Sequence, residues 1–207
     1  MTRTSSARRR RAVFLDRDGT VSEYVEYCCR PEDFRLLPWA GQAIRTLNET
    51  QLLVVLATNQ SAIARGLLTM EGLAAIHEKM RQELTRCGAR LDGIYVCPHH
   101  PDAGCVCRKP EVGMLRQAAE HHQISLSESY VVGDRRLDVL LGRAANSTTV
   151  LVRSGHPLEP ANGVVPDHEA PTLLEAVQWI LRQEAARAKR AVRRLGTATS
   201  ATEITVR

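Results

Sequence analysis

Asp16-Arg17-Asp18-Gly19-Thr20 directly follows the apolar run Ala12–Leu15 near the start of the chain. An apolar run that ends in Asp-x-Asp predicts a buried strand with two carboxylates at its carboxyl end. Open α/β sheets bind their ligands at that end of their strands. Asp16 is then placed to attack a phosphorus atom as a nucleophile, and Asp18 to donate and later accept the proton. Because turns after strands often contain Asp and Gly, the motif alone also fits an ordinary turn.

A second apolar run, Leu52–Ala57, leads into Thr58, Asn59 and Gln60. This pattern again predicts a strand that ends in polar side chains. A hydroxyl group and side-chain amides can donate hydrogen bonds to phosphate oxygens, so these three residues are candidate phosphate ligands. Because ligands bind outside the carboxyl ends of the strands in such sheets, we expect all three to lie near Asp16.

A third strand-like run, Tyr130–Gly133, ends in Asp134, and Asp138 lies four residues further on. Carboxylate oxygens are the ligands that Mg²⁺ prefers, which makes Asp134 a candidate metal ligand. Asp138 is expected to orient the site rather than to bind the metal. Arg108 and Lys109 stand between the second and third runs. The compact charge of Lys109 suits a phosphoryl group, and the planar fork of Arg108 suits a second phosphate or sugar oxygens.

A loop rich in cysteine and histidine precedes these two basic residues. It contains Cys97, His99, Cys105 and Cys107, which supply three thiolates and one imidazole. Four such ligands form the closed tetrahedral set of structural zinc sites and leave no position open for a reacting water. The alternative is a chance cluster of reduced thiols. We expect zinc here to fold the loop and so to fix the basic residues that follow Cys107.

Taken in order, these motifs resemble those of the haloacid dehalogenase (HAD) phosphohydrolases, over roughly residues 12–157. With the zinc loop, the set is similar to one HAD subgroup, the D-glycero-D-manno-heptose 1,7-bisphosphate phosphatases and the histidinol-phosphate phosphatases. The resemblance implies Mg²⁺-dependent hydrolysis of a phosphomonoester, with removal of the 7-phosphate of the heptose bisphosphate as the leading prediction. Histidinol phosphate is the alternative substrate. A nucleic-acid 3′-phosphatase is the second alternative, because Asp-x-Asp-Gly-Thr and Thr-Asn-Gln also occur there.

The same resemblance implies a role for each candidate residue. Asp16 would form an aspartyl-phosphate, and Asp18 would protonate the leaving group and then activate water. The Mg²⁺ ion would be bound by Asp16, the main-chain carbonyl of Asp18, and Asp134. The remaining candidates would hold the substrate, with Arg108 facing away from the transferred phosphoryl group; they are Thr58, Asn59, Gln60, Arg108 and Lys109.

Strand-like and helix-like segments alternate along the chain, which predicts a parallel sheet with helices on both faces. The fold class is therefore α/β, of the HAD-like (Rossmannoid) type, with a zinc-binding loop and no large cap domain. The predicted strands span residues 12–15, 52–57, 93–97, 129–132 and 149–152. The predicted helices span 41–49, 70–87, 113–123, 135–145 and 171–183, the last with a continuation toward Leu195.

The positive charge of the chain lies in its ends. Residues 1–11 contain five Arg and no acid, and residues 184–207 contain six basic and two acidic residues. The remainder, 12–183, has 17 basic and 21 acidic residues. We therefore predict a basic flexible arm (1–11), a phosphatase domain (12–183) and a basic, partly disordered extension (184–207). Basic tails can bind polyanions, but no aromatic residue interleaves with the basic runs, so binding to nucleic acid is not expected.

No apolar stretch approaches the length that spans a bilayer, so no membrane association is expected. We predict a cytoplasmic protein, in which the six cysteines are metal ligands or free thiols rather than disulfides. Cys28, Cys29 and Cys87 lie outside the zinc loop and are expected to be free. The predicted partner is a small phosphorylated sugar, and the predicted oligomeric state is a monomer.

Overall fold

A six-stranded sheet in the order β3-β2-β1-β4-β5-β6 forms the centre of the fold, and every neighbouring pair of strands is parallel. The computed structural model describes residues 9–155 and 163–200, with 193–200 described by their backbone alone. The strands are β1 (Arg11–Leu15), β2 (Leu52–Asn59), β3 (Gly93–Cys97), β4 (Tyr130–Gly133), β5 (Thr148–Val152) and β6 (His168–Ala170). The chain divides into two compact units between Ala176 and Val177, and the sheet lies in the first.

β1 lies between β2 and β4 at the middle of the sheet. Phe14 is paired with Val55 of β2 and with Val131 of β4. The side chains of Ala12–Leu15 are at most 1% exposed. A parallel strand covered on both faces reads as a continuous apolar run, which explains why no polar residue interrupts this segment. The residues that follow β1, β2 and β4 consequently meet at one edge of the sheet.

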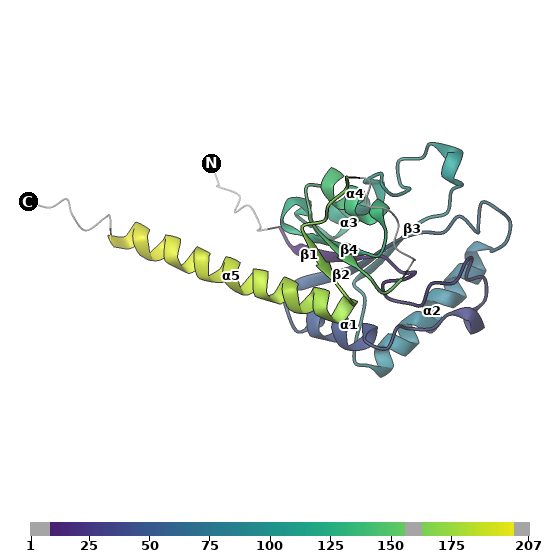
Figure 1. Ribbon diagram of the computed structural model, residues 1–207, viewed down its shortest axis with the longest axis horizontal. Helices are drawn as coiled ribbons and strands as arrows, with labels where there is room; N and C mark the ends of the chain where they lie inside the picture. Colours follow the sequence, from purple (N-terminus) through teal and green to yellow (C-terminus); the bar gives the residue numbers. More distant parts are fainter. Residues whose placement is uncertain (1–8, 156–162, 201–207) are drawn as a thin grey trace, which may run out of the picture. The chain divides into compact units, whose positions relative to one another are not determined.

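Helices cover both faces of the sheet (Figure 1). The helices of the first unit are α1 (Ala40–Asn48), α2 (Met70–Arg86), α3 (Gly113–His122) and α4 (Arg136–Ala144), with short 3₁₀ turns η1 (Pro31–Asp33), η2 (Pro101–Ala103) and η3 (Leu126–Glu128). The last helix, α5 (Leu173–Ser200), begins in the first unit and continues into the second. α3 and α4 lie on one face, where Phe14, Val55, Leu115 and Leu141 belong to one buried cluster. α1 and α2 lie on the other face (Figure 1).

The predicted elements are present, and their ends differ by at most two residues except in the last helix. Thr69 caps α2 as its Oγ1 accepts a hydrogen bond from the Gly72 main-chain N–H at 3.0 Å. β6 was not predicted, because its three residues are too few to show a pattern. α5 continues to Ser200, past the predicted range, since Ala and Arg favour helix in the segment after residue 183.

The segments that connect β1 to β2 and β2 to β3 contribute η1, α1 and α2 to the first unit. Among the described residues they form no separate cap domain, as predicted. Residues 1–8 of the predicted arm and 201–207 of the predicted extension lie outside the described residues, and Arg11 already belongs to β1. The three domain boundaries stay a prediction. Within the part of the chain that the structure describes, no helix is long and apolar enough to cross a bilayer.

Candidate active site

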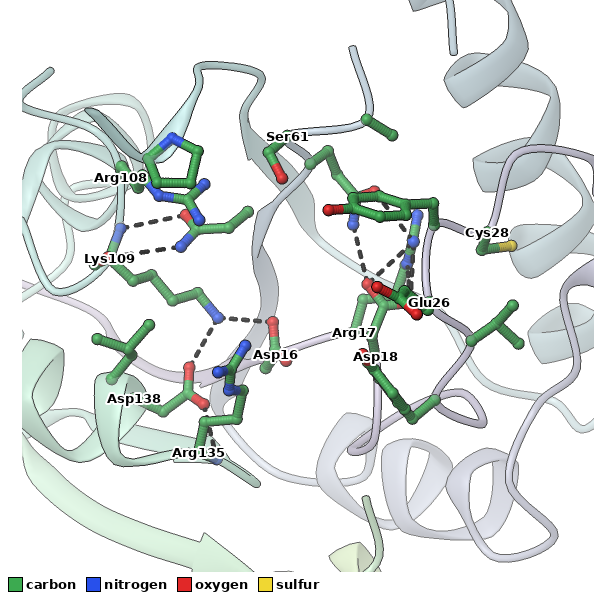
Figure 2. A pocket seen from close by; sticks show the side chains of 18 of the residues that line it. Asp16, Arg17, Asp18, Glu26, Cys28, Ser61, Arg108, Lys109, Arg135 and Asp138 are labelled. Carbon is green, nitrogen blue, oxygen red and sulfur yellow. Dashed lines mark hydrogen bonds and ion pairs between the residues drawn. The ribbon is translucent and has the colours of Figure 1, made fainter. Parts of the chain in front are cut away.

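The ammonium group of Lys109 lies between two carboxylates at the carboxyl end of β1. Its Nζ is 2.6 Å from Oδ1 of Asp16 and 2.7 Å from Oδ1 of Asp138. Asp16 directly follows β1, and Asp138 lies in the first turn of α4. All three side chains are at most 10% exposed. Figure 2 shows the two carboxylates on either side of the ammonium group.

Burial and charge act in opposite directions on these groups. Burial alone would lower the pKa of Lys109, but the carboxylates of Asp138 and Asp16 outweigh burial and raise it. Burial raises the pKa of Asp138 to about 7, although the Lys109 ammonium opposes this shift. Lys109 therefore stays protonated at neutral pH and keeps a positive charge beside the proposed nucleophile.

Three carboxylates are close enough to share one metal ion. Oxygens of Asp16, Asp134 and Asp138 all lie within 4.8 Å of one another. This all-oxygen donor set fits a hard cation such as Mg²⁺. Two glycines make room for Asp134, because a Cβ atom at Gly19 or at Gly155 would lie 2.1 or 2.0 Å from its Oδ2. Asp138 was expected to orient the site rather than to bind the metal. The structure places its carboxylate beside those of Asp16 and Asp134.

Asp18 is held by a buried arginine on the other side of Asp16 (Figure 2). Arg17 donates from Nε to Oδ1 and from Nη2 to Oδ2 of Asp18, both at 2.9 Å. Gln60 Nε2 donates to the same Oδ2 at 2.9 Å and to Thr58 Oγ1 at 2.9 Å. Burial raises the pKa of Asp18, and the Arg17 guanidinium only partly opposes this shift. A raised pKa favours the protonated form that a general acid requires.

Sequence reasoning missed Arg17 and assigned Gln60 to the phosphate. Arg17 is 1% exposed although it is charged, which marks it as a structural partner of Asp18. Its only signal in the sequence was its position between the two acids of Asp-x-Asp. The amide of Gln60 is engaged with Asp18 and Thr58, so a direct contact of Gln60 with a phosphate stays a prediction.

Asn59 fastens the Lys109 backbone to the end of β2. Its Oδ1 accepts a hydrogen bond from the Lys109 main-chain N–H at 3.1 Å, and its Nδ2 donates to the Lys109 carbonyl at 3.5 Å. Asn59 was predicted as a phosphate ligand, and that role stays a prediction. What the structure adds is that this side chain positions Lys109.

The four predicted zinc ligands converge at one point. Cys97 Sγ lies 3.6 Å from His99 Nδ1 and 3.6 Å from Cys105 Sγ, while Cys107 Sγ lies 3.2 Å from His99 Nδ1 and 3.6 Å from Cys105 Sγ. Ligands at Zn–S and Zn–N bond lengths of about 2.3 and 2.0 Å are separated by about 3.5–3.8 Å in a tetrahedron. The Cys/His set therefore fits Zn²⁺, as predicted.

The zinc loop is continuous with the Lys109 segment. The Gly113 main-chain N–H donates to the Val106 carbonyl at 2.9 Å, and a Cβ atom at Gly113 would lie 2.3 Å from that oxygen. Arg108 Nη1 donates to the His99 carbonyl at 3.4 Å. The loop thus sets the direction of the chain on both sides of Lys109. Among the described residues, all six cysteines are free of disulfides.

We expect one tightly bound zinc ion per chain. Elemental analysis of protein purified without added zinc measures this directly. Cys105→Ser should lose the metal and much of the activity because the loop no longer positions Lys109. Cys87→Ser, at an exposed cysteine outside the loop, is the matched control and should keep both. Full activity in protein that contains no zinc would contradict the expectation.

A pocket of about 250 Å³ opens above these groups (Figure 2). Its lining brings together the ends of β1 and β2, the Tyr24–Cys28 segment, the Ser61–Arg65 loop and the chain around Lys109. Among the predicted site residues, the lining includes Asp16, Asp18, Asn59, Gln60, Arg108 and Lys109. Thr58 is buried beneath Gln60. The structure thus gathers at one place residues as far apart in sequence as Asp16 and Asp138, which are 122 positions apart.

Comparison with known proteins agrees with this geometry. A HAD-hydrolase-like family model matches residues 106–176. The chain is 44% identical over 155 residues to the D-glycero-β-D-manno-heptose-1,7-bisphosphate 7-phosphatase of Yersinia pestis, a match that covers 71% of this chain and 82% of that protein. It is 38% identical over 181 residues to the Escherichia coli protein of the same name, with 84% and 95% covered.

A solved structure is similar over nearly the same span. It is a D,D-heptose 1,7-bisphosphate phosphatase from B. bronchiseptica complexed with magnesium and phosphate, and it superposes with a TM-score of 0.79 at 36% identity. The match covers 84% of this chain and 99% of that one. A second D,D-heptose 1,7-bisphosphate phosphatase, from Burkholderia thailandensis, has a TM-score of 0.62 at 28% identity, with 83% and 98% covered.

Proposed function

Because the chain belongs to the D-glycero-D-manno-heptose-1,7-bisphosphate 7-phosphatases of the HAD-like hydrolases, we propose that it removes the 7-phosphate of that sugar bisphosphate. The observation that carries the proposal is the Lys109 ammonium held between Asp16 and Asp138, with Asp18 across the same pocket. A phosphomonoester dianion repels an attacking carboxylate, so its hydrolysis requires positive charge at this position.

In the first half-reaction, an oxygen of Asp16 attacks the phosphorus and forms an aspartyl-phosphate. The bond between phosphorus and the sugar oxygen breaks, and Asp18 gives its proton to the departing alkoxide. In the second half-reaction, Asp18 takes a proton from water, the water oxygen bonds to phosphorus, and the Asp16 carboxylate is released. Arg17 and Gln60 keep Asp18 in place for both proton transfers.

Lys109 offsets charge on the transferred phosphoryl oxygens. Thr58 and Asn59 end strand β2, and Asn59 lines the pocket and positions the Lys109 backbone. When bound, Mg²⁺ supplies further charge neutralisation, and we propose Asp16, Asp134 and the main-chain carbonyl of Asp18 as its ligands, with the Asp138 carboxylate close by. Arg108 is proposed to face the rest of the substrate from the zinc loop. We further propose that the enzyme acts as a monomer in the cytoplasm, where thiols stay reduced.

A side-by-side turnover assay tests the substrate. We expect kcat/KM for D-glycero-D-manno-heptose 1,7-bisphosphate to exceed that for histidinol phosphate by at least about tenfold, which corresponds to about 1.4 kcal/mol of transition-state stabilisation. A 3′-phosphorylated oligonucleotide is the third substrate. If either competitor were the better substrate, the proposal would be wrong. Strong salt dependence of turnover on the oligonucleotide would favour the nucleic-acid alternative.

A further inference from the structure

Arg65 lies over the ring of Tyr27 at the rim of the pocket. Its guanidinium carbon is 5.7 Å from the ring centroid, and both residues line the cavity that contains Asp16. Tyr27 belongs to the connection between β1 and α1, whereas Arg65 belongs to the loop between β2 and α2. A contact between two exposed side chains of different loops needs a reason, since holding them together costs conformational freedom.

The backbone of Tyr27 has a positive φ angle, and the resulting turn leaves its ring at the pocket rim beside Arg65. Its φ is 56°, in the left-handed region that residues other than glycine rarely adopt. Such residues occur where the surrounding structure uses their conformation, often at ligand sites. The next residue, Cys28, is buried, so the turn at Tyr27 returns the chain to the core while its ring stays 38% exposed at the pocket. The Arg65 loop is also tied down, since the Ala64 main-chain N–H donates to the Pro98 carbonyl at 3.2 Å.

Arg65 differs in its pairing from three other cations that line the pocket, while a fourth, Arg135, lies beside Asp138 at the Lys109 end (Figure 2). Lys109 is paired with two carboxylates, Arg17 with Asp18 and Gln60, and Arg108 donates to a main-chain carbonyl. Among the residues the structure describes, the guanidinium of Arg65 contacts the Tyr27 ring and has no hydrogen-bond acceptor or carboxylate partner. Its donors are therefore available to an anion, and the ring restricts the guanidinium to an orientation over the pocket rim.

The neighbouring groups suit the sugar part of a ligand. Glu26 lines the same rim with an exposed carboxylate, which accepts hydrogen bonds from hydroxyl groups. Figure 2 shows it at the end of the pocket away from Lys109. The Tyr27 ring offers an apolar face beside it. A planar donor fork, a hydroxyl acceptor and an aromatic face together match a phosphate carried on a sugar.

We propose that Arg65, held on the ring of Tyr27, binds the phosphate group of the sugar substrate that is not hydrolysed. The proposal rests on the proposed function in that it needs a substrate with two phosphates. The transferred phosphate lies at the Lys109 end, so the retained dianion needs a second cation at the rim. The guanidinium of Arg65 is available for this phosphate, whereas Arg108 Nη1 already donates to the His99 carbonyl, which leaves the sugar oxygens to Arg108.

The test compares a bisphosphate with its monophosphate. We expect Arg65→Ala to lower the ratio of kcat/KM for heptose 1,7-bisphosphate to kcat/KM for heptose 7-phosphate by about ten- to a hundredfold, the range of a charge-assisted hydrogen bond. Arg65→Lys keeps the charge without the planar fork and should recover part of the ratio. Equal losses on both substrates would overturn the proposal, because Arg65 would then serve only the loop or the transferred phosphate.

Tyr27 provides matched variants. Tyr27→Phe keeps the ring and should keep the ratio. Tyr27→Asn tolerates the same backbone conformation but removes the ring, and should lower the ratio by about two- to fivefold, as expected for an exposed cation–π contact. A ratio that is unchanged in Tyr27→Asn would show that the ring does not position Arg65.

A second measurement separates this proposal from the proposed function. D-mannose 1-phosphate and inorganic phosphate are each used as competitive inhibitors of p-nitrophenyl phosphate hydrolysis. Arg65→Ala should weaken inhibition by mannose 1-phosphate about ten- to a hundredfold more than inhibition by inorganic phosphate. If Arg65→Ala showed this selective weakening but the wild-type enzyme did not hydrolyse the heptose bisphosphate, only the substrate assignment would be refuted. Equal weakening of both inhibitors would refute the role of Arg65.

Discussion

Asp16→Asn is expected to reduce kcat by at least about a thousandfold, equivalent to about 4 kcal/mol of activation free energy. The amide keeps the shape of the side chain but cannot form the aspartyl-phosphate. Lys109 retains its contact with Asp138, so the fold should survive the change. Steady-state turnover of the bisphosphate measures the effect, with circular dichroism and zinc content as checks on folding.

Asp102→Asn is the matched control for this variant. Asp102 is an aspartate whose neighbour Pro101 lines the pocket. Its own side chain lies on the zinc loop and is 88% exposed. Turnover by this control should equal that of the wild type. If Asp16→Asn retained turnover within about tenfold of the wild type, the assignment of Asp16 as nucleophile would be wrong.

Lys109→Met should damage both catalysis and stability. Without the ammonium group, the carboxylates of Asp16 and Asp138 face each other in a site that is at most 10% exposed. Removing one partner of a buried ion pair typically costs about 3–5 kcal/mol of unfolding free energy. We expect kcat to fall by about a hundred- to a thousandfold as well, since preorganised charge at the transferred group is lost.

A double variant separates these two effects. Lys109→Met with Asp138→Asn removes one of the two opposing carboxylates and should recover much of the lost stability. It should recover little activity, because no cation has returned beside Asp16. Urea unfolding and steady-state turnover of both variants provide the comparison. A single variant as stable as the double variant would contradict the electrostatic explanation, and turnover near the wild-type level would contradict the catalytic role of Lys109.

The first aspartate illustrates which features could be predicted from local patterns. A buried parallel strand must be apolar throughout, and its ligand-binding end must be polar, so the change from Leu15 to Asp16 locates both the strand and the site. The zinc ligands could be predicted for a similar reason, because all four lie within one short loop. Helix α2 was predicted over residues 70–87, and the structure places it at Met70–Arg86 with Thr69 as its cap.

Elements with little local signal could not be predicted. β6 has three residues and exists through its pairing with β5, in which Val150 is paired with His168. The length of α5 was underestimated, because helix propensity is a weak guide to where a polar helix ends.

The sequence by itself determined the class of fold, the position of the two aspartates that follow β1, and the Cys/His loop that fits zinc. Only the tertiary structure decided how these groups are paired. It placed the Lys109 ammonium between Asp16 and Asp138, 93 and 29 residues away, and it placed Arg65 over Tyr27. Spacing along the chain constrains residues within one strand, helix or loop. Contacts between distant segments depend on how the sheet brings its loops to a common edge, and no local pattern encodes that.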